Sequence, residues 1–152
     1  MGNVLFYHLT RQPLDVTLSM LLGKSLERGW RVVVRGADAG RLEWLDQRLW
    51  LQPEDGFLPH GLAGGPHDAA QPVLLTAQPE LPNDPACLMA LDGAEISLDE
   101  VDRLDRSCIL FDGQDGAAVQ MARGQWKALT GAGAKAQYWS EESGRWEKKA
   151  ES

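Results

Sequence analysis

The stretch VLFYHLTRQPLDVTLSMLLGKSLERGWRVVVR, residues 4–35, sets the fold class. Its first six residues, 4–9, form a short apolar run that is typical of a buried strand. A proline that suits the first turn of a helix follows, and leucines then recur at helical spacing, at positions 14, 18, 21, 22 and 26. Gly29 ends this helix, and the β-branched residues of 30–35 predict a second strand. Strand, helix and strand with short connections form a βαβ unit, so the two strands are expected to be parallel.

The rest of the chain repeats this alternation. Helices are predicted at residues 38–50, 97–105 and 115–130, and strands at 71–76, 87–91, 107–111 and 134–140. The last of these strands is expected at an edge of the sheet, and the polar residues from Glu141 onward are expected to be mobile. Alternating elements predict a three-layer α/β/α domain with a mainly parallel, mixed sheet. We therefore expect a single domain over residues 1–140 and a polar C-terminal tail over 141–152.

Composition and charge narrow the class of protein. The 152 residues are 43% hydrophobic and 24% charged, which is ordinary for a soluble globular protein. No apolar run approaches the roughly 20 residues that span a bilayer, and the N-terminus lacks the pattern of a signal peptide, so we expect a cytoplasmic protein without a membrane partner. The formal net charge is −7. Nucleic-acid affinity comes mostly from Lys and Arg, so direct nucleic-acid binding is not expected unless the few cations cluster.

Patterns that could indicate nucleotide or redox chemistry fail on spacing. Gly-Lys-Ser at 23–25 ends like a Walker A loop, but Leu18 stands where the loop needs a glycine, and the motif lies inside a leucine-periodic helix. Residues 96–100 resemble a Walker B end without its partner motif, so Asp99 and Glu100 are expected on the solvated face of a short helix. The two cysteines lie in separate apolar stretches without CxxC spacing and are expected to be buried and reduced.

The uncharged segment GFLPHGLAGG, residues 56–65, contains both flexible glycines and apolar side chains. Its glycines do not form a dinucleotide-binding pattern, and the histidines at 60 and 67 lack metal-ligand spacing, so no cofactor or metal is predicted. We expect His60 to hydrogen-bond backbone groups of its own loop. The alternative is a nucleotide-binding or hydrolytic α/β enzyme that uses His60, although no nucleophile or paired carboxylate stands nearby. Phe57, Leu58 and Leu62 lie either in the core or against a partner.

The last predicted helix carries a second candidate site. Arg123 and Lys127 are four residues apart and therefore share one helix face, with Trp126 beside them. Two cations and an aromatic ring on an acidic protein suit an acidic, aromatic-bearing peptide or a carboxylate terminus. The alternative is a plain solvated face with Trp126 tucked into the core, and the residues by themselves leave both open.

Several segments together resemble the chi subunit of the bacterial DNA polymerase III holoenzyme. They are FYHL at 6–9, LD at 45–46, LW at 49–50, Asp55, FLPHGLAG at 57–64, QPV at 71–73, AR at 122–123 and WK at 126–127. The similarity covers essentially the whole chain. It implies a nucleotide-binding-like fold without a nucleotide site, in agreement with the failed Walker patterns. It also implies a non-enzymatic accessory subunit of the clamp-loader assembly in DNA replication, without a cofactor.

The resemblance further implies a binding site for the acidic C-terminal tail of single-stranded-DNA-binding protein. Carried over to this chain, Arg123 would pair with the terminal carboxylate of the tail's final phenylalanine. Trp126 would wall the pocket for that phenylalanine, and Lys127 would face the tail's aspartates. Thr130 stands where family members carry another basic residue, which leaves fewer cations at this site. Contact with DNA would be indirect, through the coating protein.

A second surface is implied for a small psi-type subunit, through which the protein would join the clamp loader if the organism has one. It would include Trp50, Phe57 and the turn formed by Leu58, Pro59 and His60.

Overall fold

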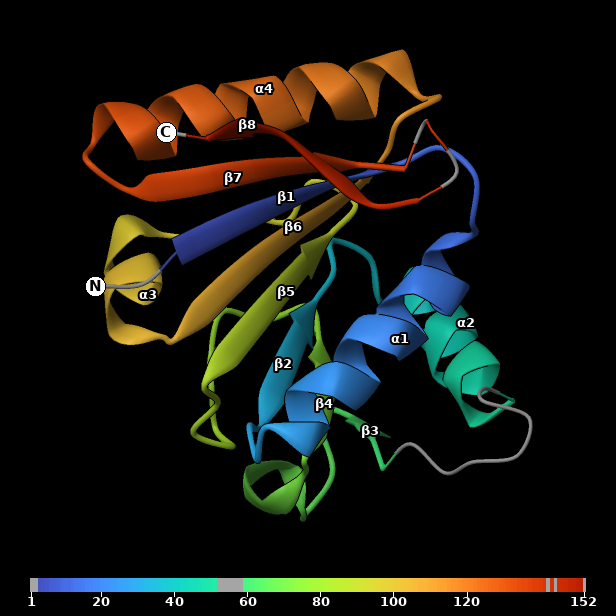
Figure 1. Ribbon diagram of the computed structural model, residues 1–152. Helices are drawn as coiled ribbons and strands as arrows, with labels where there is room; N and C mark the ends of the chain where they lie inside the picture. Colours follow the sequence, from blue (N-terminus) through green and yellow to red (C-terminus); the bar gives the residue numbers. More distant parts are fainter. Residues whose placement is uncertain (1–2, 52–58, 142, 144, 152) are drawn as a thin grey trace.

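The protein folds around one eight-stranded sheet (Figure 1). The structure, a computed structural model, describes residues 3–51, 59–141, 143 and 145–151. The strands are β1 (Asn3–Leu9), β2 (Val32–Arg35), β3 (Gly61–Leu62), β4 (Val73–Thr76), β5 (Cys87–Leu91), β6 (Arg106–Asp112), β7 (Lys135–Ser140) and β8 (Glu147–Glu151). The helices are α1 (Leu14–Glu27), α2 (Ala39–Trp50), α3 (Leu98–Arg103) and α4 (Gly116–Gly131), with a 3-10 turn at Asp68–Ala70.

The strand order is β3-β4-β2-β5-β6-β1-β7-β8. Every neighbouring pair from β3 to β7 is parallel, and β8 runs antiparallel to β7. The predicted mixed, mainly parallel sheet is therefore confirmed. β1 and β2 point the same way, as the βαβ pattern predicted, but β5 and β6 lie between them. The first crossover thus spans half of the sheet.

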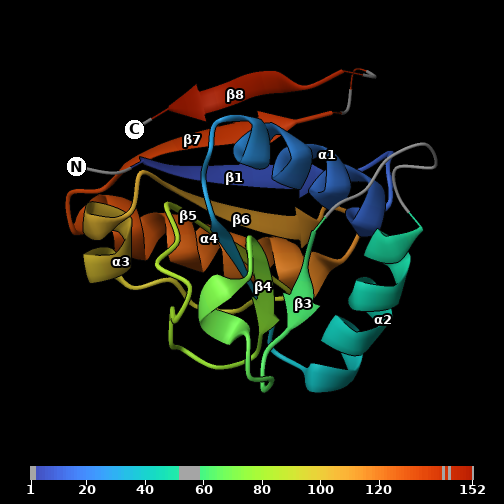
Figure 2. The ribbon, with the colours of Figure 1, turned by 90° about the horizontal axis from the view of Figure 1, so that it is seen from below.

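Two hydrophobic cores lie on opposite faces of the sheet, because successive strand residues point to opposite sides. In β1, Leu5 and Tyr7 join the core that α1 and α2 cover, while Val4 and Phe6 join the core that α3 and α4 cover. Figures 1 and 2 show the sheet between these two pairs of helices. The predicted three-layer arrangement is confirmed.

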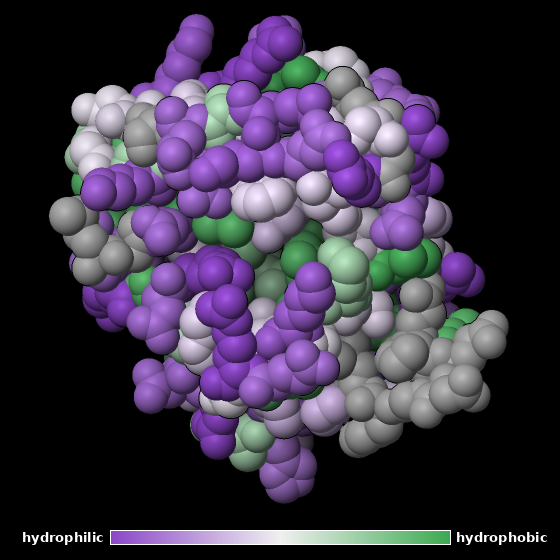
Figure 3. Space-filling view, viewed as in Figure 1, coloured by the Kyte–Doolittle hydropathy of each residue, from purple (hydrophilic) through white to green (hydrophobic). Residues whose placement is uncertain are grey.

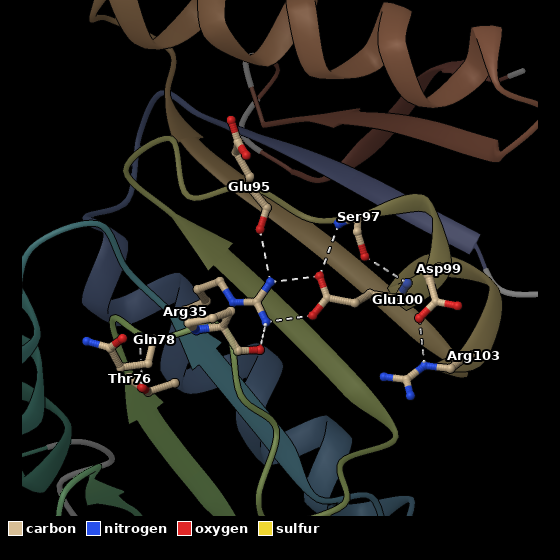
Figure 4. Close-up of polar contacts among 9 residues, drawn as sticks. Arg35, Thr76, Gln78, Glu95, Ser97, Asp99, Glu100 and Arg103 are labelled. Carbon is tan, nitrogen blue, oxygen red and sulfur yellow. Dashed lines mark hydrogen bonds and ion pairs between the residues drawn. The ribbon is translucent and has the colours of Figure 1, made fainter.

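A buried ion pair fixes α3 to the sheet (Figure 4). At the end of β2, Arg35 meets the two carboxylate oxygens of Glu100 at 2.8 and 2.6 Å, and it also donates to the main-chain carbonyls of Glu95 and Pro79. The hydrogen bonds from Arg35 lower the pKa of Glu100. The expectation that Asp99 and Glu100 share a solvated face is right for Asp99 and wrong for Glu100. The partner of Glu100 is a strand residue distant in sequence, which helix periodicity cannot reveal.

The chain after β7 differs from the predicted mobile tail. β8 pairs with β7, so β7 is not an edge strand within the described part of the chain. Trp146 packs edge-on against Tyr7, with 5.4 Å between ring centroids. The prediction failed because β8, with the sequence EKKAE, has none of the β-branched or aromatic residues that indicate a strand.

Among the described residues, none of the helices has the length and apolar character that crossing a membrane requires.

Candidate functional site

Helix α4 presents a cationic face to solvent. Asp115 caps its first turn by accepting hydrogen bonds from two backbone amides. Ala122 and Leu129 are buried against the sheet, whereas Arg123 and Lys127, one turn apart, are exposed. The helix contains no acidic residue, and neither cation forms an ion pair with any described residue. The positive charge of this face is therefore available to a partner.

Trp126 lies at the base of this face. Its half-buried ring meets Phe6 edge-on at 5.2 Å and Tyr138 at 6.2 Å between centroids. The ring of Trp126 thus packs partly into the core, as one alternative held, while the two exposed cations lie beside it, as the other requires. Thr130 donates its hydroxyl hydrogen bond to the Trp126 carbonyl at 2.7 Å, so it turns back onto the helix and extends no polar group beyond it.

Sequence reasoning missed Tyr138, which connects this face to the centre of the sheet. Its hydroxyl is hydrogen-bonded to Nδ1 of His8, and its ring packs against His8 at 5.7 Å and Phe111 at 6.0 Å between centroids. The signal that could have found it is the alternation along β7, which puts Ala136 and Tyr138 on the face that α4 covers.

A second candidate surface surrounds the end of α2. Trp50 and Leu51 are 51% and 65% exposed, and Leu62 on β3 is also exposed. Hydrophobic residues reach the surface on the side of the molecule where α2 lies (Figure 3). Of the other residues predicted here, Pro59 is half-buried, while Phe57 and Leu58 lie outside the described residues. Trp50 and Leu51 are adjacent in sequence and both exposed, and neighbouring exposed apolar side chains are typical of interaction surfaces.

His60 lies beneath this surface and not on it. It is only 5% exposed, and its ring lies 4.3 Å from the Trp50 ring, centroid to centroid. Its Nε2 is 3.1 Å from the main-chain oxygen of Asp46 and 3.2 Å from Asp46 Oδ1. These contacts attach His60 to α2, and most of the loop to which bonds were predicted, residues 52–58, lies outside the described residues. His60 is therefore a buried side chain that packs against Trp50.

Three successive backbone amides after β1 surround a carboxylate of the protein itself. The N–H groups of Thr10, Arg11 and Gln12 donate to Oε1 of Glu141 at 3.1, 2.9 and 2.9 Å. Glu141 is only 4% exposed. Amides that follow a strand in this way are where nucleotide-binding folds hold phosphate. A phosphate at this position would have to displace the buried carboxylate.

The cleft beside these amides is acidic. It has a volume of about 670 Å³ and opens at the carboxyl ends of β1 and β6. Its lining includes Asp92, Asp112 and Asp115 against Arg11 and Arg41, and Arg41 already pairs with Asp92 at 3.2 Å. This charge balance disfavours a nucleotide. Within the described residues, no three His, Cys, Asp or Glu side chains gather as a metal site would require.

Comparison with known proteins identifies the family. Residues 1–137 match the family model described as DNA polymerase III chi subunit, HolC. The chain belongs to this family. A curated relative from Rickettsia prowazekii (strain Madrid E), named "Probable DNA polymerase III subunit chi", is 25% identical over 91 residues. The match covers 60% of this chain and 55% of the relative, so it spans little more than half of that relative's length. The family match includes α4 and Trp50, and it stops before Glu141 and β8.

Proposed function

We propose that this protein is a non-catalytic accessory subunit of DNA polymerase III that connects the clamp loader to single-stranded-DNA-binding protein. In this role α4 binds the acidic C-terminal tail of single-stranded-DNA-binding protein, and the surface around Trp50 binds a psi-type subunit of the clamp loader. The protein would act in the cytoplasm and reach coated DNA only through its partner. Membership of the chi family supports the general role.

The observation that carries the tail site is a pair of cations, on a helix without acidic residues, that have no ion-pair partner among the described residues. The protein carries a net charge of −7, so a free acidic peptide is repelled by most of its surface. Arg123 and Lys127, one helical turn apart on α4, form a local positive region that can attract such a peptide. An arginine can pair with a terminal carboxylate through two parallel hydrogen bonds, and the half-buried ring of Trp126 provides an adjoining apolar contact.

Fluorescence anisotropy with a labelled acidic peptide that ends in phenylalanine tests this site. Arg123→Ala should weaken binding by about tenfold or more, because a charge-assisted hydrogen bond contributes about 1.5–3 kcal/mol. Arg103→Ala is the matched control, since Arg103 is an exposed arginine on α3 that pairs with Asp99. Added salt should weaken wild-type binding. Equal affinities for wild type and Arg123→Ala would refute the assignment of the tail to α4.

The α2 surface calls for a separate experiment. Trp50→Ala should reduce binding to a clamp loader that contains a psi-type subunit by about 30-fold, as expected for a central aromatic contact. Trp44→Ala is the control, because Trp44 is also exposed on α2 but lies six residues away, on another side of the helix. Surface plasmon resonance gives both affinities. Trp44→Ala and Trp50→Ala variants with the same affinity as wild type would remove this surface from the proposal.

The alternative of an enzyme that uses His60 gains no support from the site. The His60 side chain is fully enclosed, and its described polar contacts go to Asp46 of α2. A general base must reach the proton that it removes, which this position prevents.

A further inference from the structure

A basic cleft lies on the face of the sheet opposite α4. It has a volume of about 460 Å³ and is formed where the C-terminal turns of α1 pass over β5 and β6. Figure 3 shows this face of the molecule hollowed near its centre, between hydrophilic side chains. Neither α4 nor the surface around Trp50 contributes to the cleft. It is therefore separate from both proposed partner sites.

Three cations line this cleft without a counter-ion. They are Lys24, Arg28 and Arg106, and none forms an ion pair with a described residue. Glu27 is the one carboxylate in the described lining. The cleft thus has an excess of two positive charges in a protein whose net charge is −7. Seven other Lys or Arg residues of the described chain do have carboxylate partners.

One indole ring holds two of these cations together. The guanidinium carbons of Arg28 and Arg106 lie 4.9 and 5.3 Å from the centre of the Trp30 ring. Arg28 follows α1 and Arg106 begins β6, so the ring gathers charges from two separate elements. A cation–π contact orients a guanidinium but does not neutralise it. The repulsion between two like charges held close together is reduced when an anion binds between them.

The hydroxyl group of a tyrosine belongs to the same cleft. Tyr7 lines it and is only 8% exposed, yet its hydroxyl has no hydrogen-bond partner among the described residues. Burial raises the pKa of Tyr7, so the hydroxyl keeps its proton and can donate. Because the hydroxyl faces the cleft and has no partner among the described residues, it is available to donate to an acceptor that a ligand supplies.

The end of α1 accounts for only part of this arrangement. The carboxyl end of a helix carries about half a negative charge, which attracts cations such as Lys24 in its last turn. That attraction does not reach the strand residue Arg106, and it does not explain the unpaired hydroxyl of Tyr7. Three cations also exceed what half a charge can balance, so the excess is left for an external anion.

We propose that this cleft binds a small organic phosphate, of the size of a sugar phosphate or a mononucleotide. Arginine side chains match phosphate oxygens through paired N–H donors. Arg28 and Arg106 both line the cleft, and both contact the Trp30 ring. Tyr7 would donate a further hydrogen bond from the floor. The volume lies within the roughly 300–1,000 Å³ of small-molecule sites and exceeds what an inorganic anion fills. Apolar lining by Leu21 and Met89 suits the organic part of the ligand.

Isothermal titration calorimetry of the full chain at constant ionic strength tests this proposal. The ligands are AMP, ribose 5-phosphate, inorganic phosphate, citrate and adenosine. The two organic phosphates should bind, inorganic phosphate and citrate should bind at least several-fold more weakly, and adenosine should give no signal. Absence of binding by AMP and ribose 5-phosphate at millimolar concentration would overturn the proposal, as would equal binding of citrate.

Variants then locate the ligand. Arg106→Gln should weaken binding about tenfold or more, while Arg103→Gln, the same change at an exposed ion pair, should leave it unchanged. Tyr7→Phe keeps the buried ring and should weaken binding about threefold to tenfold without lowering the melting temperature of the free protein. Equal weakening by Arg106→Gln and Arg103→Gln would identify non-specific screening and contradict the site. Tail-peptide binding should be the same in Arg106→Gln and wild type, which separates this test from that of α4.

Discussion

Charged groups at the carboxyl ends of the strands are satisfied inside the protein, whereas the cations of α4 are not. Arg35 forms two hydrogen bonds with Glu100, and the amides after β1 converge on Glu141. Arg123 and Lys127 stand in solvent without a described carboxylate partner. The carboxyl ends of parallel strands are where α/β folds usually hold ligands, and here much of that end is used to hold the fold together.

The difference separates charges that stabilise the fold from charges that can bind a partner. A buried pair is costly to break, because the remaining charge is left without a counter-ion. An exposed, unpaired cation contributes little to folding but can contribute fully to binding. Substitutions in the two regions should therefore affect different measurements.

Arg35→Ala should have the largest effect on stability. It leaves the carboxylate of Glu100, whose side chain is only 13% exposed, without its ion-pair partner, so the free energy of unfolding should fall by about 3–5 kcal/mol. Urea denaturation followed by circular dichroism measures this loss. Arg103→Ala, which breaks an exposed pair with Asp99, should change stability by less than about 1 kcal/mol. A similar, small loss in both variants would show that burial does not distinguish the two pairs.

Glu141→Gln should have the next largest effect. The variant replaces a charged acceptor of three backbone N–H groups by a neutral one, and the expected loss is about 2 kcal/mol. Glu151→Gln, at an exposed position on β8, is the control and should change stability by less than about 1 kcal/mol. If Glu141→Gln unfolds at the wild-type urea concentration, the carboxylate does not hold the loop after β1.

The ion pair of Glu100 should also make stability depend on pH. Its pKa in the folded protein lies below the usual value of 4.5 because Arg35 donates to the ionised form. Its stabilising effect is therefore complete above about pH 4.5 and is lost as the pH falls through the lowered folded pKa. Urea midpoints of wild type and Glu100→Gln should differ at pH 7 and approach each other below pH 4. A difference that stays constant over this range would contradict the assignment.

Arg123→Ala should have the smallest effect on stability. The side chain is exposed and has no described ion pair, so the free energy of unfolding should change by no more than about 0.5 kcal/mol. The same urea experiment measures it. A loss above about 2 kcal/mol would mean that Arg123 belongs with the internally paired charges, and the comparison between the two regions would fail.

Local patterns predicted most of the fold but few of the long-range contacts. The leucines of α1 and the apolar residues of β1 are regular enough to predict both elements. The βαβ pattern also predicted correctly that β1 and β2 run parallel. β3 was missed because its two residues, a glycine and a leucine, are too few to show a strand pattern. β8 was missed because its mixed charges resemble a solvated tail.

The candidate sites show the same limit. The i, i+4 spacing of Arg123 and Lys127 correctly predicted a shared, exposed helix face, because it depends only on helix geometry. The partners of Glu141 and Glu100 are residues about 130 and 65 positions away, and only the folded sheet brings them together. The contact of His60 with the main-chain oxygen of Asp46 on α2 was likewise not predicted, because it depends on how α2 packs against the loop.

The central claim is that Arg123 pairs with the terminal carboxylate of the acidic tail, and a double-mutant cycle tests it most directly. Wild type and Arg123→Ala are each titrated with the tail peptide in its free-acid and C-terminally amidated forms. We predict that amidation weakens binding to wild type about tenfold and leaves binding to Arg123→Ala nearly unchanged, because the carboxylate has then already lost its partner. Equal loss of affinity on amidation in both proteins would show that the terminal carboxylate binds elsewhere.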